Sequence, residues 1–214
     1  MPDHLRAPLE NYLAAAASGE PTPGGGSVSA LAGALGASMA AMAANFTVGK
    51  KQFAAVEPEA RELLGKVEDL RKKLQELTQK DTEAYGAVSA AFKLPKAAPE
   101  EKTARKAAIA AACRGAMAVP LEALRACRET LLATRRLAEI ANPNLISDVG
   151  VAALLLEAAA GGSALNVAVN LPSIGDRELA AAVQAELNAT LADCARLSKE
   201  SQDLVAAALM KGAG

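Results

Sequence analysis

The sequence is poor in histidine and in aromatic residues. His4 is the only histidine among 214 residues, Trp is absent, and aromatic side chains make up 2% of the chain. A zinc site or a histidine-based catalytic triad is therefore not expected, and the sequence lacks the aromatic side chains on which nucleic-acid bases stack. Any acid–base chemistry must come from carboxylates, lysines, backbone groups or water. We predict no metal site.

The sequence also has no large excess of either charge and no closely spaced pair of cysteines. The net charge of −1 gives no reason to expect nucleic acid or an anionic membrane as the main partner. Cys113, Cys127 and Cys194 stand far apart without a CxxC pair, which is typical of reduced, buried thiols. The N-terminal segment has no apolar stretch of the kind that forms a signal peptide. We therefore expect a cytoplasmic protein with no nucleic-acid partner.

A long uncharged run extends from Val28 to Val48. It is long enough to cross a bilayer, which takes about 20 residues. However, it contains glycine, serine, asparagine and threonine, and its many alanines are only weakly lipophilic. We find no second segment of this kind in the sequence. The run is interpreted as a buried helix, and no membrane association is expected.

The residues that are present favour helices. Hydrophobic residues make up 51% of the chain and are largely Ala and Leu, which favour close-packed helices over sheets. No repeat or linker divides the chain, so we predict one all-α domain over residues 1–214, an up-and-down antiparallel bundle with a buried Ala/Gly-rich central helix. The predicted helices run from Asp3 to about Ser18, from Ser27 to Gly49, from about Pro58 to Phe92, from Pro99 to Ile140 with Pro120 as a kink or a new start, from Ser147 past Asn166, and from Asp176 to about Met210.

The stretch Pro21 to Lys51 places three glycines before the central helix. A glycine run before a helix leaves backbone N–H groups free to meet an anion or a carbonyl, so Gly24, Gly25 and Gly26 are candidate ligand-binding residues. Ser27 is predicted to cap the helix. The alternative is that the glycines form only a turn. The small residues of the helix allow a close helix crossing, in the core or at a dimer interface.

A carboxylate interrupts an apolar seam on the third predicted helix. The seam repeats with alternating spacings of four and three, as in a heptad, and position 81 in it is Asp. A buried carboxylate costs several kcal/mol unless it is paired or protonated. Asp81 is therefore a candidate for chemistry, and the alternative is that the seam ends one turn early with Asp81 at a wet margin. The apolar positions are Leu63, Val67, Leu70, Leu74, Leu77, Ala84 and Val88.

The stretch from 142 to 176 holds a second group of polar residues. Ser147 can cap a helix and Asp148 can complement its dipole. Asn166 and Asn170 share a helical face one turn apart, and Ser163 lies one turn before them. If the helix is continuous, Asp148 and Asn166 are five turns or ~27 Å apart. They could then serve one small site only with a long ligand or a second subunit.

Four arginines, Arg125, Arg128, Arg135 and Arg136, follow one another on the fourth predicted helix. A solvated helix face is the simplest interpretation. The alternative is that they attract a polyanionic part of a substrate.

Two blocks of this sequence resemble the cyclodeaminase/cyclohydrolase family. They are PTPGGGS…ALAGALGA…M…AN.T.GKK and N.N..SD.GVAA.LL.AA..G...NV..NL..I.D, and the D..AY segment at Asp81–Tyr85 and LPK at Leu94–Lys96 match as well. The resemblance covers nearly the whole chain. It implies an all-α bundle that forms a homodimer and acts in one-carbon tetrahydrofolate metabolism, without a metal or a cofactor beyond the tetrahydrofolate substrate.

The resemblance implies one of two reactions. A cyclodeaminase closes 5-formiminotetrahydrofolate to the 5,10-methenyl cation with loss of ammonia, and a cyclohydrolase adds water to that cation to give 10-formyltetrahydrofolate. We expect the cyclodeaminase, with the cyclohydrolase as the alternative and a non-catalytic ligand-binding bundle as a further alternative. Asp81 and Asp148 are the candidate catalytic residues. The candidate substrate-binding residues are Gly24, Gly25, Gly26, Ser27, Lys50, Asn144, Ser147, Asn166 and Asn170.

Overall fold

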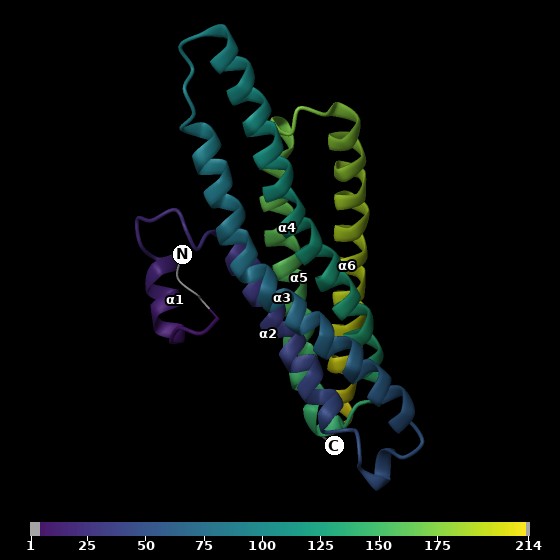
Figure 1. The fold of residues 1–214 in the computed structure, drawn as a ribbon. Coiled ribbons are helices and arrows are strands. Elements are labelled where there is room, and N and C mark those ends of the chain that lie inside the picture. The colour runs from purple at the N-terminus through teal and green to yellow at the C-terminus, as the bar shows by residue number, and fades with distance from the viewer. Residues whose placement is uncertain (1–4, 213–214) are drawn as a thin grey trace.

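A computed structural model describes residues 5–212. Within that range every regular element is an α-helix or a short 3-10 turn, and there is no strand (Figure 1). The prediction of an all-α up-and-down bundle is confirmed. The elements are α1 (Leu9–Ala16), α2 (Gly25–Asn45), η1 (Lys51–Phe53), α3 (Glu57–Phe92), α4 (Pro99–Ile140), η2 (Pro143–Leu145), α5 (Ile146–Ala168), η3 (Leu171–Ser173) and α6 (Arg177–Gly212).

Helices α2 to α6 pack side by side and alternate in direction. Helix α4 contacts α2, α3, α5 and α6, and α2 packs mainly between α3 and α5. Two glycines of α2 permit this close approach. A Cβ atom at Gly33 would lie 3.0 Å from the sulfur of Cys127, and one at Gly36 would lie 2.8 Å from Leu156. The small residues of α2 therefore bring its neighbours close to its backbone.

One side of α2 is open, which corrects the expectation of a helix covered all round. Val28, Leu35, Met42 and Phe46 are exposed, and they follow one another at intervals of seven, seven and four residues. The other sides of the helix are buried against α3, α4 and α5. Helix α2 thus belongs to the core and also presents an apolar line to solvent.

Several predicted helix ends differ from those in the structure. Helix α2 begins at Gly25 with Gly24 as its N-cap, so Ser27 lies inside the first turn and is not the cap. Helix α5 begins at Ile146, and Ser147 likewise does not cap it, whereas Asp148 does lie in its first turn. Helix α4 continues through Pro120 as one element. The predicted cap of α6 is confirmed, because Asp176 accepts a hydrogen bond from the backbone of Leu179.

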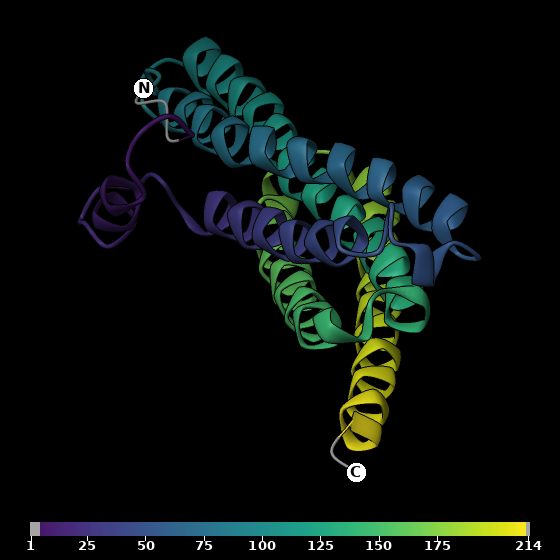
Figure 2. The same cartoon turned by 90° about the horizontal axis from the view of Figure 1, so that it is seen from below.

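Helix α1 stands away from the bundle in both views (Figures 1 and 2). Leu5, Leu9 and Leu13 are exposed, and Tyr12 is the buried residue of this helix. Asp3, the predicted cap of α1, lies outside the described residues. The Tyr12 side chain therefore anchors α1 to the bundle.

The four arginines of α4 are paired with carboxylates of neighbouring helices. The pairs are Arg125–Glu186, Arg128–Asp193, Arg135–Glu200 and Arg136–Glu59, with closest N–O distances between 2.5 and 3.1 Å. They link α4 to α6 and α3 across the surface of the bundle. Since their charges are already matched, these arginines are neither a merely solvated face nor a free site for an anion.

Three segments are long and apolar enough to cross a membrane, namely α2, α4 and residues 143–173. The expectation that the sequence holds one such segment is therefore wrong. In α2, 61% of the apolar window is buried inside the bundle.

Candidate active site

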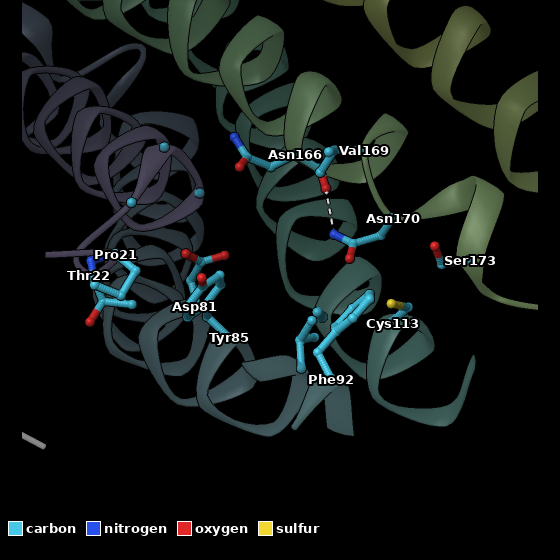
Figure 3. Close-up of a pocket in the computed structure, with 15 residues that line it drawn as sticks. Pro21, Thr22, Asp81, Tyr85, Phe92, Cys113, Asn166, Val169, Asn170 and Ser173 are labelled. Atoms are coloured by element: carbon cyan, nitrogen blue, oxygen red, sulfur yellow. Dashed lines mark hydrogen bonds between the residues drawn. The ribbon is translucent and has the colours of Figure 1, made fainter. Parts of the chain in front are cut away.

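A pocket of about 430 Å³ opens beside the first turn of α2 (Figure 3). Its walls come from four helices: the N-terminus of α2, the second half of α3, the middle of α4 and the C-terminal end of α5 with η3. The residues that line it are Pro21, Thr22, Gly24, Gly25, Gly26, Asp81, Tyr85, Val88, Phe92, Cys113, Ala116, Asn166, Val169, Asn170 and Ser173. The structure thus brings together the glycine run, one of the two candidate aspartates and the candidate asparagines Asn166 and Asn170.

Asp81 occupies the point where the seam of α3 passes from core to pocket. Leu77 and Leu74, one and two turns earlier, are fully buried, whereas Asp81 lines the pocket together with residues farther along α3. Tyr85, Val88 and Phe92 follow Asp81 on this wall of the pocket, and of these Val88 is a predicted seam position. The seam therefore does not end at a wet margin, because its second half forms one side of a cavity.

The carboxylate of Asp81 reaches the backbone at the start of α2. It accepts a hydrogen bond from the backbone N–H of Ser27, one of the first-turn groups without a partner inside the helix. A Cβ atom at Gly26 would lie only 2.1 Å from Asp81 Oδ1, so glycine is required for this approach. Asp81 therefore supplies, from another helix, the cap that Ser27 was predicted to provide.

Burial raises the pKa of Asp81 above the ordinary value for an aspartate, and the hydrogen bond from Ser27 opposes this shift without cancelling it. Desolvation disfavours the charged form of a carboxyl group, whereas a donor N–H favours it. The result is a carboxyl group that holds its proton to a higher pH than usual. Such a group is suited to take up and return a proton.

The side chain of Ser27 faces the core and does not cap α2 as predicted. Its hydroxyl donates to the carbonyl oxygen of Thr78 over 2.8 Å and lies 2.9 Å from the hydroxyl of Tyr12. Since the single proton of Ser27 Oγ is used on Thr78, Tyr12 is the donor to Ser27. Burial raises the pKa of Tyr12, and the charge of Asp81 adds to the shift. Tyr12 and Ser27 thus brace the turn that positions Asp81.

Asn166 of α5 and Asn170, which lies just after that helix at the start of η3, both line the pocket. The side-chain amide of Asn166 donates to the carbonyl of Gly162 over 2.9 Å. That of Asn170 donates to the carbonyl of Asn166, also over 2.9 Å (Figure 3). A Cβ atom at Gly25 would lie 3.1 Å from the amide nitrogen of Asn166, so this side chain also packs on α2. Each amide uses one of its two N–H groups on a backbone carbonyl, so both side chains can still accept hydrogen bonds through the oxygen atom and donate the second N–H.

The remaining candidate residues lie at the other end of the bundle. Because α5 is continuous and antiparallel to α2, the start of α5 meets the end of α2, where the backbone N–H of Asn142 donates to Thr47 Oγ1 over 2.9 Å. Asp148 lies in that first turn of α5, and the predicted separation of ~27 Å from Asn166 follows from the helix geometry. Within one chain, the residues Lys50, Asn144, Ser147 and Asp148 are absent from the pocket lining.

The apolar walls were not predicted as part of a site. Tyr85, Phe92 and Cys113 contribute a ring, a second ring and a thiol to the lining. The heptad spacing of α3 would not have identified the first two, because after Asp81 it selects Ala84 and Val88, and Tyr85 and Phe92 each lie one position beyond a seam residue. Among residues 5–212, no three His, Cys, Asp or Glu side chains are placed to bind one metal ion.

Comparison with known proteins assigns the family. A sequence model of the formiminotransferase-cyclodeaminase family matches residues 8–189. A methenyltetrahydrofolate cyclohydrolase of Methylorubrum extorquens is 41% identical over 197 residues, which are 92% of this chain and 95% of that protein. The chain belongs to the formiminotransferase-cyclodeaminase family.

Other members of the family show how the domain is used. The formimidoyltransferase-cyclodeaminase of Rattus norvegicus is 35% identical over 172 residues, which are 80% of this chain and 32% of that longer protein. The crystal structure of formiminotetrahydrofolate cyclodeaminase from Thermotoga maritima superposes with a TM-score of 0.85 at 31% identity, covering 95% of this chain and 98% of that one. The family is one of folate one-carbon enzymes. The prediction of an enzyme, as opposed to a non-catalytic bundle, is therefore confirmed.

Proposed function

We propose that the protein is a methenyltetrahydrofolate cyclohydrolase, which adds water to 5,10-methenyltetrahydrofolate and releases 10-formyltetrahydrofolate. The observation that carries the proposal is the 41% identity with the cyclohydrolase relative over 95% of that protein. The cyclodeaminase relatives are 31–35% identical, so our first expectation gives way to its alternative. The pocket supports the proposal through its carboxyl group and its largely apolar walls.

Asp81 is the group that would perform the proton transfers. The substrate carries a positive charge on the carbon between N5 and N10, and the carboxylate of Asp81 stabilises that charge. A water molecule adds to the carbon and gives one proton to Asp81. The N5–C bond then breaks, N5 takes the proton from Asp81, and the hydroxyl proton leaves to solvent as the formyl C=O forms. The raised pKa of Asp81 suits it to this exchange.

The other pocket residues bind and orient. The oxygen atoms of Asn166 and Asn170 accept hydrogen bonds from N–H groups of the ring system, and the rings of Tyr85 and Phe92 pack against its faces. The backbone of Gly24 to Gly26 forms the wall next to Asp81. Because the reaction moves only protons and water, we propose that it needs no metal and no cofactor beyond the tetrahydrofolate substrate.

Two assays distinguish the proposed reaction from the deamination. Hydrolysis of 5,10-methenyltetrahydrofolate is followed by the loss of its near-ultraviolet absorbance, corrected for the uncatalysed rate. Ammonia release is measured with 5-formiminotetrahydrofolate. We expect fast hydrolysis and no ammonia. Ammonia release with hydrolysis no faster than the uncatalysed rate would contradict the proposal.

We also propose that the protein forms a homodimer through an exposed apolar stripe on α2 and α5. On α2 the stripe follows positions 28, 32, 35, 39, 42 and 46, which alternate by four and three as in a coiled-coil seam. On α5 it includes Val151, Leu154, Leu165 and Val169, which are 44–73% exposed. Two adjoining lines of exposed apolar residues on small-residue helices suit a second copy of the same surface.

The dimer gives the residues at the far end of the bundle a role. If the second copy runs antiparallel, the end of its α2 and the start of its α5 come next to the first turn of α2. The partner's Lys50, Asn144 and Asp148 would then approach the pocket that holds Asp81. This arrangement would also resolve the ~27 Å separation between the two candidate aspartates.

Mixing two inactive variants tests the shared site. We expect Asp81→Ala and Asp148→Ala each to lose turnover as homodimers. When they are unfolded and refolded together, half of the dimers are mixed and each has one intact site, so about one quarter of the wild-type rate should return. No recovery would place both aspartates in one subunit's site, and full activity of Asp148→Ala alone would remove it from the site.

A substitution in the stripe, followed by the mass of the protein in solution, tests separately whether the stripe forms the dimer interface. Leu35→Lys puts a charge in the middle of the stripe, and we expect it to halve the mass found by sedimentation. Leu209→Lys is the matched control, since Leu209 is equally exposed on α6, outside the stripe. A dimer that survives Leu35→Lys would show that another surface is used.

The location of the protein is proposed on the same grounds. The three cysteines are free and buried, as in proteins of reducing compartments. The apolar faces of α2 pack against other helices or belong to the stripe. We propose a cytoplasmic enzyme that binds neither membrane nor nucleic acid.

A further inference from the structure

Arg105 differs from the paired arginines of α4 in having no carboxylate partner. Among residues 5–212, no carboxylate oxygen lies within 4.0 Å of its guanidinium group. Its Nη2 atom donates to the carbonyl oxygen of Phe92 over 3.0 Å, and its Nε atom is buried without a hydrogen-bond partner. A buried guanidinium N–H without an acceptor is costly. The side chain is therefore held in place with part of its binding capacity unused.

Arg105 lies next to a residue that lines the pocket. Its guanidinium carbon lies 5.6 Å from the centre of the Phe92 ring, and Phe92 lines the pocket (Figure 3). Phe92 follows Asp81 by eleven residues on α3, or about 16 Å along the helix. The pocket thus has the carboxylate of Asp81 in its wall, and a cation without a carboxylate partner lies beside Phe92, a lining residue farther along α3.

The surroundings of Arg105 are positively charged. Residues 93–106, which are the α3–α4 connection and the first two turns of α4, contain five cations and two carboxylates, a balance of +3 in a chain of net charge −1. One of the two carboxylates, Glu101, is used by the backbone N–H groups of Ala97 and Ala98. Lys106 lines a second hollow of about 270 Å³, which adjoins the pocket at Ser173. An anion leaving the pocket in this direction meets cations first.

We propose that Arg105 binds a carboxylate of the substrate's glutamate tail and that the hollow beside Lys106 receives further glutamates. The inference depends on the proposed function, because it concerns the substrate of that same pocket. In 5,10-methenyltetrahydrofolate the cationic one-carbon centre lies between the pterin and the benzoyl ring, and the glutamate carboxylates lie beyond that ring. This separation of opposite charges matches the carboxylate of Asp81 and the guanidinium of Arg105, which lie apart along α3. Phe92 lies between them, where the benzoyl ring would pass.

The kinetic test compares substrates with and without the tail. For methenyltetrahydrofolate we expect Arg105→Gln to raise KM about tenfold or more, as for loss of a charged hydrogen bond, with kcat unchanged. For methenyltetrahydropteroate, which lacks glutamate, wild type and variant should have the same KM. Arg61→Gln is the control for the lost charge, since Arg61 pairs with Glu57 at the far end of α3. It should behave as wild type.

Two results would overturn the inference. An equal rise in KM for the tailless substrate would mean that Arg105 only supports Phe92. An unchanged KM for methenyltetrahydrofolate would mean that the tail lies elsewhere. Calorimetric binding of p-aminobenzoyl-triglutamate to wild type and Arg105→Gln gives a readout without turnover. If wild type binds this fragment and the variant does not, the subsite stands even when neither reaction is catalysed.

Discussion

Replacement of Gly26 by alanine tests the contact that positions Asp81. A Cβ atom at position 26 would lie 2.1 Å from Oδ1, 2.6 Å from Cγ and 2.8 Å from Oδ2 of Asp81. Ordinary contact begins at 3.4 Å, so the carboxylate must withdraw by about 1.3 Å. That displacement takes it out of reach of the Ser27 N–H. Gly26→Ala therefore displaces the carboxyl group of Asp81 without replacing it by another chemical group.

The expected magnitudes follow from these contacts. Loss of a hydrogen bond to a charged group costs about 1.5–3 kcal/mol, and alanine in place of glycine in a helix recovers up to about 1 kcal/mol. We expect Gly26→Ala to be less stable than wild type by about 1 kcal/mol. A catalytic group misplaced by about 1 Å loses roughly 100-fold in rate. We therefore expect turnover to fall by about two orders of magnitude with a nearly intact fold.

The assay is the hydrolysis of methenyltetrahydrofolate, with stability taken from urea unfolding. Gly65→Ala is the matched control, because position 65 lies on α3 with nothing within 4 Å of an added Cβ atom. It should gain about 0.5–1 kcal/mol and keep its turnover. Wild-type turnover of Gly26→Ala would refute the argument, since Asp81 would then act equally well from a displaced position.

Three further predictions concern charge and packing. Because burial raises the pKa of Asp81, its carboxyl group favours the fold at low pH and loses that contribution as the pH rises through its folded-state value. Asp81→Asn should therefore be inactive yet more stable than wild type at neutral pH, and urea unfolding in mild acid should show a smaller difference. Leu74→Ala, at a fully buried position, should cost about 3 kcal/mol in urea unfolding. Burial raises the pKa of Cys194 to about 12 and that of Cys127 further, so neither thiol should react with a disulfide reagent until denaturant is added.

Asp81 could be identified from the sequence because it is the one charged residue in the regular apolar seam of α3. The alternation of four and three fixes which side of α3 is buried, and a carboxylate at one of those positions needs a physical reason. The structure supplies it, since the seam leaves the core at Asp81 and becomes a pocket wall. The asparagines were identified for the same reason, as polar residues sharing one face of an apolar helix.

The role of Ser27 could not be obtained in this way. A serine after glycines satisfies the local rule for a helix cap, but the rule considers only the chain around it. In the structure the cap comes from Asp81, more than fifty residues later, and the serine hydroxyl serves Thr78 and Tyr12. Contacts between distant segments decided the outcome, and no local pattern contains them.

The candidate residues also divide between the two ends of the bundle for a physical reason. Each of the two resemblance blocks covers a whole helix, α2 in one case and α5 in the other. A helix of 21 residues is about 30 Å long, so residues at its two ends cannot meet the same small ligand. Because α2 and α5 are antiparallel, the start of α2 lies beside the end of α5, next to Asp81. The end of α2 lies beside the start of α5, which holds Asp148. One chain can thus assemble only half of the candidate set at its pocket, and an antiparallel second copy is the simplest way to unite the two halves.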